Sequence, residues 1–498
     1  MISGKLSIFT PTIFFSNPII MLVFCGFLSL LWPLFFSSKS YVHRVGIFLQ
    51  FIFQIYLVIS SIYEISKYGM SSYDLYAEHL SNNLLFTIQT SRIGIIFASL
   101  VVVLWPAAYF YSISYLESSG EGFESRFLFF LNLSICSALL LSIAGDIITL
   151  FICYEILTLS TIPLVSHHYT IHVNHVLKKY LLYLVGGSLC LWLPSILYLS
   201  HNDGVLFKLG GNIVIATLSA RMQIIILVAS IFGIAKAAIF PMHSWLPSAM
   251  AANYPTSAIL HAVLVVNAGI YCIYKIIAEI FGLDLINRLF LESQWIQYIL
   301  LFGVFYAGIM AVMQNTLKKI LAWSTVAYLN LITLIALSGS KILFIISVLA
   351  LITHSFSKIS LFFCGGYIYI KNYSTKLKEF RGSAKKFRII FLLFVIAIIP
   401  MKFIIYNSWC RNIIMQMENN ILIFAMVISS TLSYMYFGKI LIEMSLNRVN
   451  GDNNLISRSP TSSFMMIAIV YTVILAMVFL FYSHHIFGFL YSFLSAEL

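Results

Sequence analysis

The sequence predicts an all-α protein that crosses a membrane about fourteen times. Hydrophobic residues make up 61% of the 498 residues and charged residues only 9%, whereas about a quarter of the residues in a soluble domain are charged. The mean hydropathy of +0.96 points the same way. About fourteen apolar stretches have the roughly 17 to 25 residues that one crossing needs. The polar segments between them are too short for a catalytic domain.

The apolar stretches follow one another along the whole chain with short connections. The opening residues, Met1 to Asn17, lack the basic start and cleavable apolar core of a signal peptide, so the first stretch is expected to be a retained helix. The stretches are centred near Phe24, Gln54, Leu104, Ser134, Leu157, Cys190, Leu227, Val266, Val304, Leu329, Leu351, Ile396, Ile428 and Ile474.

The net charge of +12 reflects lysines and arginines that gather in short loops and at the ends of the apolar stretches, as in the segment from Lys371 to Arg388. Basic loops of this kind set the topology of a membrane protein, so nucleic-acid binding is not expected. The seven cysteines lie in or beside apolar stretches without CxxC spacing, as small core residues do. No Gly-rich nucleotide loop or flavin motif is present. We therefore expect no metal and no other cofactor in this chain.

One stretch combines polar residues with helix breakers in an otherwise apolar setting. A charge at bilayer depth costs from about 3 to more than about 10 kcal/mol, and proline interrupts a helix and frees carbonyls that only protein or a wet cavity can satisfy. We therefore expect Lys236 to lie beside a helix break inside the protein, on a path for protons or ions. The alternative is that its ammonium reaches the membrane surface and the histidines cap segment ends. The stretch runs from Gly233 to Lys275 and contains Lys236, His243 and His261 together with Pro241, Pro247 and Pro255.

An acidic residue in an earlier stretch, GDIITLFICYEILTLSTIPLV, is the natural partner of this lysine. Asp146 at its start is expected to cap the helix. Glu155 follows nine residues later, about 13 Å along the helix, so it should lie near mid-membrane, where a carboxylate takes up a proton or finds a cation. Lys236 is one candidate partner, and local satisfaction by Thr158 is the alternative. Lys179 in the next stretch could also point inward.

Polar residues recur in the second half of the chain. Lys319 lies one position deeper in its helix than Lys318, which is expected to be a surface charge. His354 and Lys358 are four residues apart, so they share one helix face and could relay protons. The alternative is a hydrogen-bonded core histidine without a function.

A second interrupted stretch contains Pro400 in mid-run, with Lys402 beside it. This arrangement mirrors Pro241 and Lys236. Two interrupted segments in the two halves of a transporter point to inverted repeats with the ion path between them.

Four blocks of sequence carry a resemblance to a known family: GDIITLFICYEILTLSTIPLV, KAAIFPMHSWLPSAM followed by PTSAILHAV, LKKILAWSTVAYL, and HSFSKISLFF. In this order they resemble the antiporter-like proton-conducting subunits shared by respiratory complex I and the Mrp-type monovalent cation/proton antiporters, over roughly Arg126 to Trp409. YEILTLSTIPLV and ILHAVLVVNAGIYCIYKI look most similar to bacterial D-type antiporter subunits.

The resemblance implies a fourteen-helix core with two inverted five-helix repeats, in which helices 7 and 12 are broken and protons cross through hydrated half-channels joined by a central polar row. The expected parts are three helices in residues 1–120, a first repeat in 121–282, a second in 283–445, and a loop with the last helix in 446–498. The implied proton pathway consists of the fifth-helix Glu155 paired with the seventh-helix Lys236, then the eighth-helix His261, the tenth-helix Lys319, and the eleventh-helix His354 and Lys358.

The chain departs from the family pattern at the central row. Asn267 stands where D-type subunits carry a lysine on the eighth helix, and Asn253 and Tyr254 interrupt the usual Pro-Thr-Pro run. The lysine expected on the twelfth helix falls near Ser408, which leaves Lys402 as a displaced substitute. Hydrated Asn267 could still bridge the row.

These observations favour a multi-pass protein of the cell inner membrane, or of the mitochondrial inner membrane if the chain is organellar. The leading hypothesis is the proton-translocating subunit of an Mrp-like antiporter that exchanges protons for Na⁺ or K⁺ together with other small hydrophobic subunits. A membrane-arm subunit of an NADH:quinone oxidoreductase is the second hypothesis, and its redox chemistry would lie on other chains. A non-conducting scaffold subunit is the third.

Overall fold

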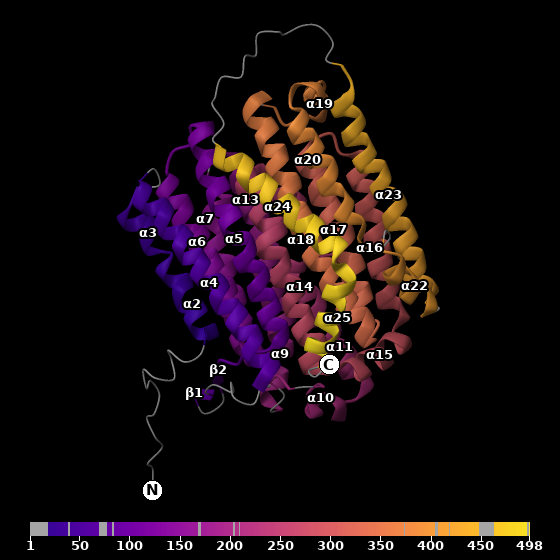
Figure 1. The fold of residues 1–498 in the computed structure, drawn as a ribbon. Coiled ribbons are helices and arrows are strands. Elements are labelled where there is room, and N and C mark those ends of the chain that lie inside the picture. Colours follow the sequence, from indigo (N-terminus) through magenta and orange to yellow (C-terminus); the bar gives the residue numbers. More distant parts are fainter. Residues whose placement is uncertain are drawn as a thin grey trace.

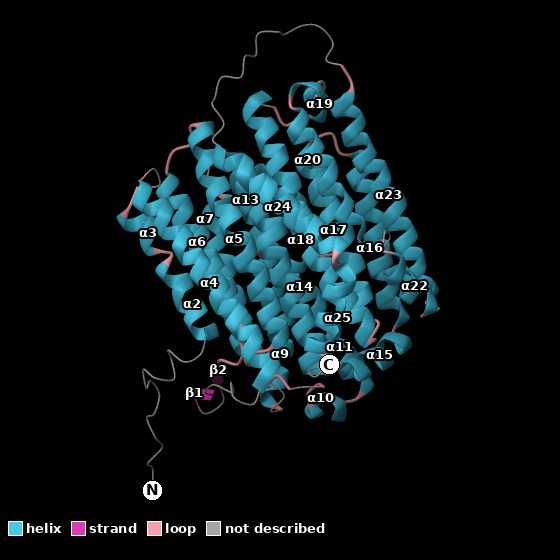
Figure 2. Cartoon of the chain, viewed as in Figure 1, coloured by secondary structure: helices cyan, strands magenta, loops and turns pink. Residues whose placement is uncertain are grey.

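Helices run side by side through most of the chain, as Figure 1 shows for the computed structural model. Figure 2 shows one small strand pair beside them. The structure describes residues 18–37, 40–68, 77–81, 84–167, 171–202, 205–208, 210–372, 374–403, 407–417, 419–447, 463–495 and 498. The expectation for Met1 to Asn17 and most of the connection from Asn447 to Ser462 therefore lie outside the described residues.

The first crossing is divided into two short helices, the next two are long helices, and an antiparallel strand pair with Ala77 opposite Thr87 joins the second crossing to the third. The third helix begins at Ser91, whose hydroxyl accepts a hydrogen bond from the Gly94 amide, a common way to satisfy a free N–H group at a helix start. The elements are α2 (Pro18–Leu28), α3 (Leu31–Phe35), α4 (Tyr41–Tyr68), β1 (Ala77–Ser81), β2 (Leu84–Thr87) and α5 (Arg92–Ser119).

The next five crossings contain most of the irregular helix geometry. Three π-helical segments and two short 3₁₀ segments interrupt them. The elements are α6 (Glu124–Ser142), α7 (Ile147–Val165), α8 (Ile171–Gly187), η1 (Ser188–Trp192), α9 (Leu193–His201), α10 (Ile213–Thr217), α11 (Ala220–Gly233), η2 (Ala235–Ala237), α12 (Trp245–Ser248), η3 (Ala249–Ala251), α13 (Tyr254–Ala258), η4 (Ile259–Val263), α14 (Val265–Lys275) and η5 (Ile276–Phe281).

The remaining crossings are more regular, apart from one interrupted helix. The elements are α15 (Leu283–Glu292), α16 (Gln294–Met313), α17 (Leu317–Ala336), α18 (Lys341–Asn372), η6 (Leu377–Phe380), α19 (Ser383–Lys386), α20 (Arg388–Ile398), η7 (Ile399–Lys402), α22 (Ser408–Gln416), α23 (Asn420–Ser445), α24 (Ser463–Phe481) and α25 (Ser483–Leu494). In Figure 1, α24 runs obliquely across the front of the bundle.

Twelve helices in the described part of the chain are long and apolar enough to cross a membrane. They match twelve of the fourteen predicted stretches. The two remaining stretches, near Leu227 and Ile396, fall on α11 and on α20 with η7, which are too short because the chain breaks there. The all-α polytopic fold is therefore confirmed, with the small β1–β2 pair as an addition. The predicted part boundaries fall between helices, and the division into two repeats stays a prediction.

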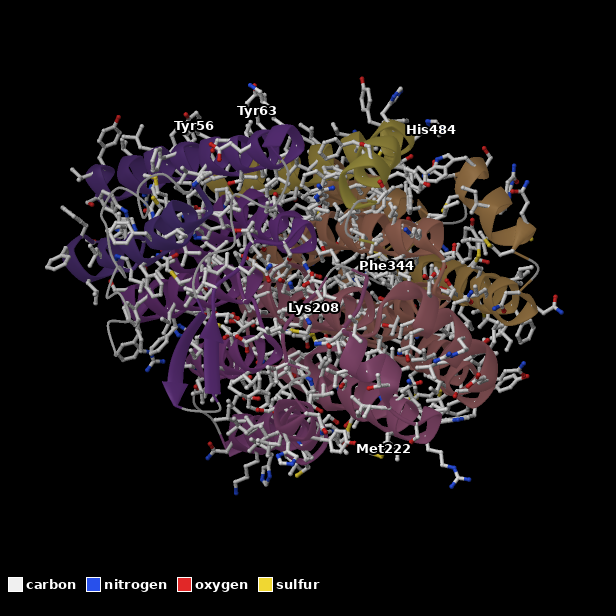
Figure 3. The ribbon with its side chains drawn as sticks, turned by 90° about the horizontal axis from the view of Figure 1, so that it is seen from below. Tyr56, Tyr63, Lys208, Met222, Phe344 and His484 are labelled. Atoms are coloured by element: carbon white, nitrogen blue, oxygen red, sulfur yellow. The ribbon has the colours of Figure 1, made fainter. Side chains whose placement is uncertain are left out.

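The most buried crossings lie in the middle of the bundle. The span Tyr254–Phe281 is buried throughout, and Leu317–Ala336 and Lys341–Asn372 almost throughout. Helices at the rim are different: Tyr56 and Tyr63 of α4 point outward in Figure 3 and are more than half exposed. Polar side chains on the central spans must therefore find their partners in the protein itself.

Candidate functional site

The helix break after α11 is held by side chains from other parts of the fold. The chain passes into the 3₁₀ segment η2, which contains Lys236. The Trp245 indole donates a hydrogen bond to the Ala235 carbonyl at 2.8 Å, and the Phe240 amide donates to the side-chain oxygen of Asn330 at 3.2 Å. Since freed backbone groups need partners at this depth, these contacts keep the break in place.

Lys236 is fully buried against α7. Its ammonium donates to the Tyr154 carbonyl and to the Thr158 hydroxyl, each at 2.5 Å, and lies 3.1 Å from the centroid of the Tyr154 ring. The Lys236 amide also donates to the Tyr154 hydroxyl at 3.1 Å. The prediction of a lysine beside a break inside the protein is confirmed, and the alternative of an ammonium at the membrane surface is wrong for this residue.

Glu155 lies on the same helix, between the two residues that hold Lys236, but it has another partner. The Ser188 hydroxyl donates to its carboxylate at 2.5 Å, and the side chain is half-buried. The Thr158 hydroxyl accepts a hydrogen bond from Lys236, so the structure does not show the alternative in which Thr158 is the hydrogen-bond partner of Glu155. Among the described residues no ion pair joins Glu155 to Lys236. The ion pairs found there are Arg44–Glu117, Lys275–Glu279 and Arg381–Glu443.

Two of the polar residues lie in π-helical segments, which often mark functional sites. Ser188 begins η1, and His261 lies in η4. The His261 ring is fully buried, packs 5.0 Å from the Phe362 ring, and has no hydrogen-bond partner at either nitrogen among the described residues. Lys358 lies close enough for its charge to act on this ring.

Asn267 stabilises the π-helical turn that carries His261. Its amide nitrogen donates to the Ala262 carbonyl at 2.6 Å and to the Ser355 hydroxyl at 2.9 Å. The first bond reaches a carbonyl of the π-helical turn, and the second ties α14 to α18 beside His354. At the position where a lysine was expected, the chain thus has a positioning residue.

His354 and Lys358 both lie on α18, where their spacing of four residues gives them a shared face as predicted, and both are fully buried. The Lys358 ammonium donates to the Leu321 carbonyl at 2.9 Å and to the Ser324 hydroxyl at 2.5 Å. The His354 ring stacks on Tyr328 at 4.9 Å, and in the described part of the chain its two nitrogens have no hydrogen-bond partner. No described protein group therefore hydrogen-bonds to the His354 ring, and the choice between a relay and a core histidine stays a prediction.

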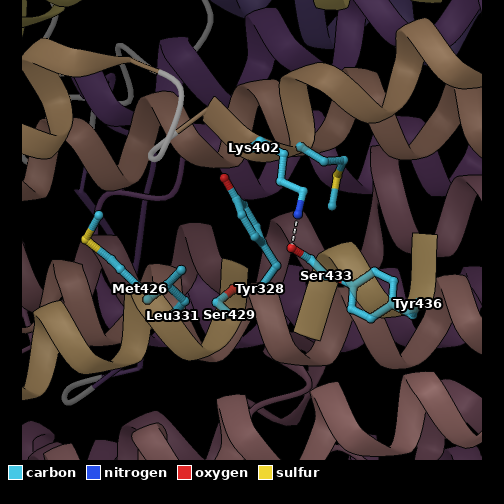
Figure 4. A pocket seen from close by; sticks show the side chains of 8 residues that line it. Tyr328, Leu331, Lys402, Met426, Ser429, Ser433 and Tyr436 are labelled. Atoms are coloured by element: carbon cyan, nitrogen blue, oxygen red, sulfur yellow. Dashed lines mark hydrogen bonds between the residues drawn. The ribbon is translucent and has the colours of Figure 1, made fainter. Parts of the chain in front are cut away.

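Lys402 repeats the arrangement of Lys236 at the second break. It ends the 3₁₀ segment η7, is 4% exposed, and its ammonium donates to the Ser433 hydroxyl on α23 and to the Ser430 carbonyl at 3.3 Å. Figure 4 shows Lys402 reaching toward Ser433, with Tyr328 and Tyr436 nearby.

The expectation that Lys318 is a surface charge is wrong. Lys318 is buried, donates to the Ala252 carbonyl at 2.5 Å and lies over the Tyr254 ring, whereas Lys319 is exposed. Successive residues of a helix point about 100° apart, so the face that a residue occupies decides its burial, and depth along the helix does not.

The two remaining predicted residues, Lys179 and His243, lie near the first helix break. Lys179 is half-buried, whereas its neighbour Lys178 is exposed. His243 is buried among the rings of Phe240, Tyr306 and Trp323, and Lys179 lies close enough to act on it electrostatically.

The sequence-based reasoning missed a buried ion pair between Lys275 and Glu279. Both side chains are almost fully buried, and the Lys275 ammonium also donates to the Ser91 hydroxyl at 3.1 Å. The spacing of four residues within the apolar run IYCIYKIIAEIF was a usable signal, because oppositely charged residues at this spacing lie on one helix face.

Comparisons with known proteins find relatives among antiporter subunits. The relatives include the A-type component of the Na(+)/H(+) antiporter of Alkalihalophilus pseudofirmus, which is 28% identical over 302 residues, or 57% of this chain and 36% of that protein. They also include the probable A/B-type component of a K(+)/H(+) antiporter of Rhizobium meliloti, 26% identical over 295 residues, or 57% of this chain and 28% of that protein. The chain thus spans about a third of the length of these curated relatives. Neither relative is of the D type, so the finer likeness to D-type subunits stays a prediction.

A similar fold is known from a chain of the membrane-bound sulfane sulfur reductase, an archaeal respiratory membrane complex. The TM-score is 0.76 with 18% sequence identity, and the match covers 97% of this chain and 100% of that chain. The family model "NADH:quinone oxidoreductase/Mrp antiporter, TM" matches residues 144–433, more than half of the sequence. The polytopic protein described here therefore belongs to the NADH:quinone oxidoreductase/Mrp antiporter transmembrane family.

Proposed function

We propose that this chain is the proton-translocating subunit of an Mrp-like multisubunit antiporter that exchanges protons for Na⁺ or K⁺. The observation that carries the proposal is a series of titratable side chains inside the helix bundle, two of them at helix breaks, and all of them are buried except the half-buried Glu155. Such groups inside a membrane protein mark ion or proton pathways. The pathway consists of Glu155, Lys236, His261, His354, Lys358 and Lys402.

Glu155 and Lys236 form the switch at one end of this pathway. Thr158 and Tyr154, which hold the lysine, flank Glu155 on α7. A small movement of the ammonium from Thr158 toward Glu155 would close an ion pair, and its return would open the pair again. Because the protonation states of such a pair are coupled, closing and opening can take up and release one proton.

The two histidines continue the pathway. The ring nitrogens of His261 and His354 have no partner in the described part of the chain, and the two rings lie close enough to influence each other electrostatically. A neutral imidazole offers one donor and one acceptor nitrogen, so each ring can pass on a proton without leaving its place. Water that enters the row under turnover would join them.

The partners expected for this protein are other small hydrophobic membrane proteins. The antiporter relatives are named as subunits, and the rim helix α4 exposes large apolar side chains along its length. The membrane is the cell inner membrane under this proposal.

A membrane subunit of a redox-driven complex is the second candidate. The observation that favours it is the match to a chain of an archaeal respiratory membrane complex over 97% of this sequence. Identification of the subunits in a gently extracted native complex separates the two candidates. Flavin and iron–sulfur chains would favour the redox-driven complex, and small antiporter subunits without them would favour the antiporter.

The proposal is tested with Glu155→Gln in the native complex. We expect everted membrane vesicles to lose Na⁺- or K⁺-dependent proton movement while the complex stays intact on a native gel. Glu292→Gln is the matched control, because this glutamate is exposed at the end of α15. Unchanged transport in the Glu155→Gln vesicles would leave only the scaffold hypothesis.

A further inference from the structure

A group of exposed basic side chains lies at one end of the bundle, where the chain passes from α18 to α20. Figure 1 shows α19 at this end, above α20. Five basic side chains between residues 376 and 388 are exposed, against one exposed acidic side chain, Glu379. None of the ion pairs found among the described residues involves these five. They are called the basic platform below and consist of Lys376, Lys378, Lys385, Lys386 and Arg388.

The backbone under the platform is fixed to other parts of the fold. Leu377 is buried, and its amide donates to the Asn315 carbonyl at 2.8 Å. The Arg381 guanidinium pairs with Glu443 of α23 at 2.7 Å, and the Gly382 amide donates to a carbonyl just after α23 at 2.8 Å. The exposed cations therefore keep one arrangement, whereas a loose basic loop would spread them.

The cations keep hydrogen-bond donors for a ligand. The Lys385 ammonium donates to the side-chain oxygen of Asn447 at 2.8 Å, and the Lys386 ammonium lies 5.2 Å from the centroid of the Phe387 ring. Both partners are neutral, so neither compensates the charge. An ammonium has three donors, and a phosphate group with several oxygens can accept from more than one cation.

An apolar stripe on α20 continues directly from the platform. Ile389 and Leu392 are 64% and 58% exposed, and the half-exposed Ile396 and Ile399 follow them. Spacings of three or four residues place these side chains on one helix face. Because α20 belongs to a membrane-spanning bundle, this face meets acyl chains, and the basic side chains above it lie at the level of the lipid headgroups.

The charge of the connection also indicates which side of the membrane it faces. Short loops rich in lysine and arginine stay on the cytoplasmic side, and the segment from Lys371 to Arg388 is such a loop. Anionic lipids of the cytoplasmic leaflet attract clusters of about four to eight basic residues next to a membrane-spanning helix. The five exposed cations of the platform fall within this range.

We propose that the basic platform and the outer face of α20 form a binding site for an anionic phospholipid. The phosphate and headgroup lie on Lys385, Lys386 and Arg388, and an acyl chain lies along Ile389 and Leu392. Cations alone would also bind soluble phosphate, and the stripe alone would accept any lipid, so the combination selects this class of ligand. Its binding does not depend on whether the chain conducts protons.

The site is tested by titrating the intact complex, purified in a neutral detergent, with phosphatidylglycerol. The variant combines Lys385→Gln, Lys386→Gln and Arg388→Gln. Each basic residue near an anionic surface changes the affinity roughly fivefold, so the apparent Kd of the variant should rise about a hundredfold at low salt. The affinity for phosphatidylcholine should not change. A variant that keeps the charges, with Lys385→Arg, Lys386→Arg and Arg388→Lys, should bind phosphatidylglycerol like the wild type.

The matched control neutralises three exposed cations at the opposite end of the bundle, near β1 and α10 in Figure 1. It combines Lys67→Gln, Lys208→Gln and Arg221→Gln and should bind phosphatidylglycerol like the wild type. An equally large loss of affinity in this control would overturn the site, because it would show that net charge alone attracts the lipid.

Three further results would overturn the proposal. Equal affinity of the wild type and the neutralised variant would show that the platform does not bind the lipid. Competition by inorganic phosphate at the concentration of the lipid would show a site for a soluble anion, and loss of a subunit from the neutralised variant would show a protein interface. If the neutralised variant does not assemble, Lys386→Gln alone decides: we expect a loss of about fivefold, and unchanged affinity would overturn the site.

Discussion

Removal of the Thr158 hydroxyl tests the proposed switch between Glu155 and Lys236 most directly. Lys236 has two oxygen acceptors, the Tyr154 carbonyl and the Thr158 hydroxyl, each at 2.5 Å. Thr158→Val removes the second acceptor and keeps a β-branched side chain of nearly the same shape, so the helix and its packing should persist. Lys236 then still donates a hydrogen bond to the Tyr154 carbonyl and still lies over the face of the Tyr154 ring.

The size of the effect follows from the lost bond. A hydrogen bond that involves a charged group contributes about 1.5–3 kcal/mol, and each 1.4 kcal/mol corresponds to a factor of about ten. The equilibrium constant between Lys236 held in its place and Lys236 released from it should therefore fall by about tenfold to about a hundredfold. If the switch depends on this position, coupled transport falls by a similar factor.

The assay is cation-dependent proton flux in everted vesicles, with the amount of intact complex measured in the same membranes. Thr158→Ser, which restores the hydroxyl, should recover the flux. Thr333→Val is the matched control, because Thr333 is also buried but its hydroxyl donates only to the Leu329 carbonyl of its own helix. Wild-type flux in Thr158→Val would refute the reasoning that Thr158 positions the lysine.

Two further predictions concern packing and burial. Gly269→Ala should clearly lower the melting temperature of the complex, because a Cβ there would lie 2.2 Å from the Ala237 amide nitrogen at the first break. Such overpacking costs about 1–3 kcal/mol or more. Gly438→Ala is the control and should not change the melting temperature, because Gly438 has open space around it. Lys318→Met should reduce the proton flux or the melting temperature, since it deletes a buried hydrogen bond to the Ala252 carbonyl. Lys319→Met, on the exposed side of the helix, should leave both unchanged within experimental error. A larger effect of Lys319→Met than of Lys318→Met in the same assays would contradict the burial argument.

The sequence predicted those parts of the fold and site for which the free-energy cost of a buried charge or a broken helix leaves few possible arrangements. A lysine in an apolar stretch near a proline must be inside the protein or at the surface, and the surrounding apolar length made an interior position of Lys236 the better prediction. The four-residue spacing of His354 and Lys358 likewise fixes a shared face. The same reasoning placed both interrupted helices correctly, near Leu227 and Ile396.

The parts that sequence reasoning could not supply depend on contacts between distant segments. Ser188 holds Glu155 across 33 residues of sequence, and nothing in the local pattern around either residue indicates this contact. The π-helical geometry that carries His261 has no residue signature of its own. The prediction that Lys318 is exposed was wrong because the direction in which the first side chains of a helix point depends on where the chain leaves the preceding loop.

Asn267 occupies the position at which the family resemblance implies a lysine. Its amide hydrogens are used by the Ala262 carbonyl and the Ser355 hydroxyl, so it orders the turn around His261 but brings no charge to the row. Lys358 then remains as the cation near the two histidines. Since an isolated charge at this depth is costly, a proton that leaves Lys358 needs a short route to the next basic group. Under the proposed function that group is Lys402, which is buried at the second helix break.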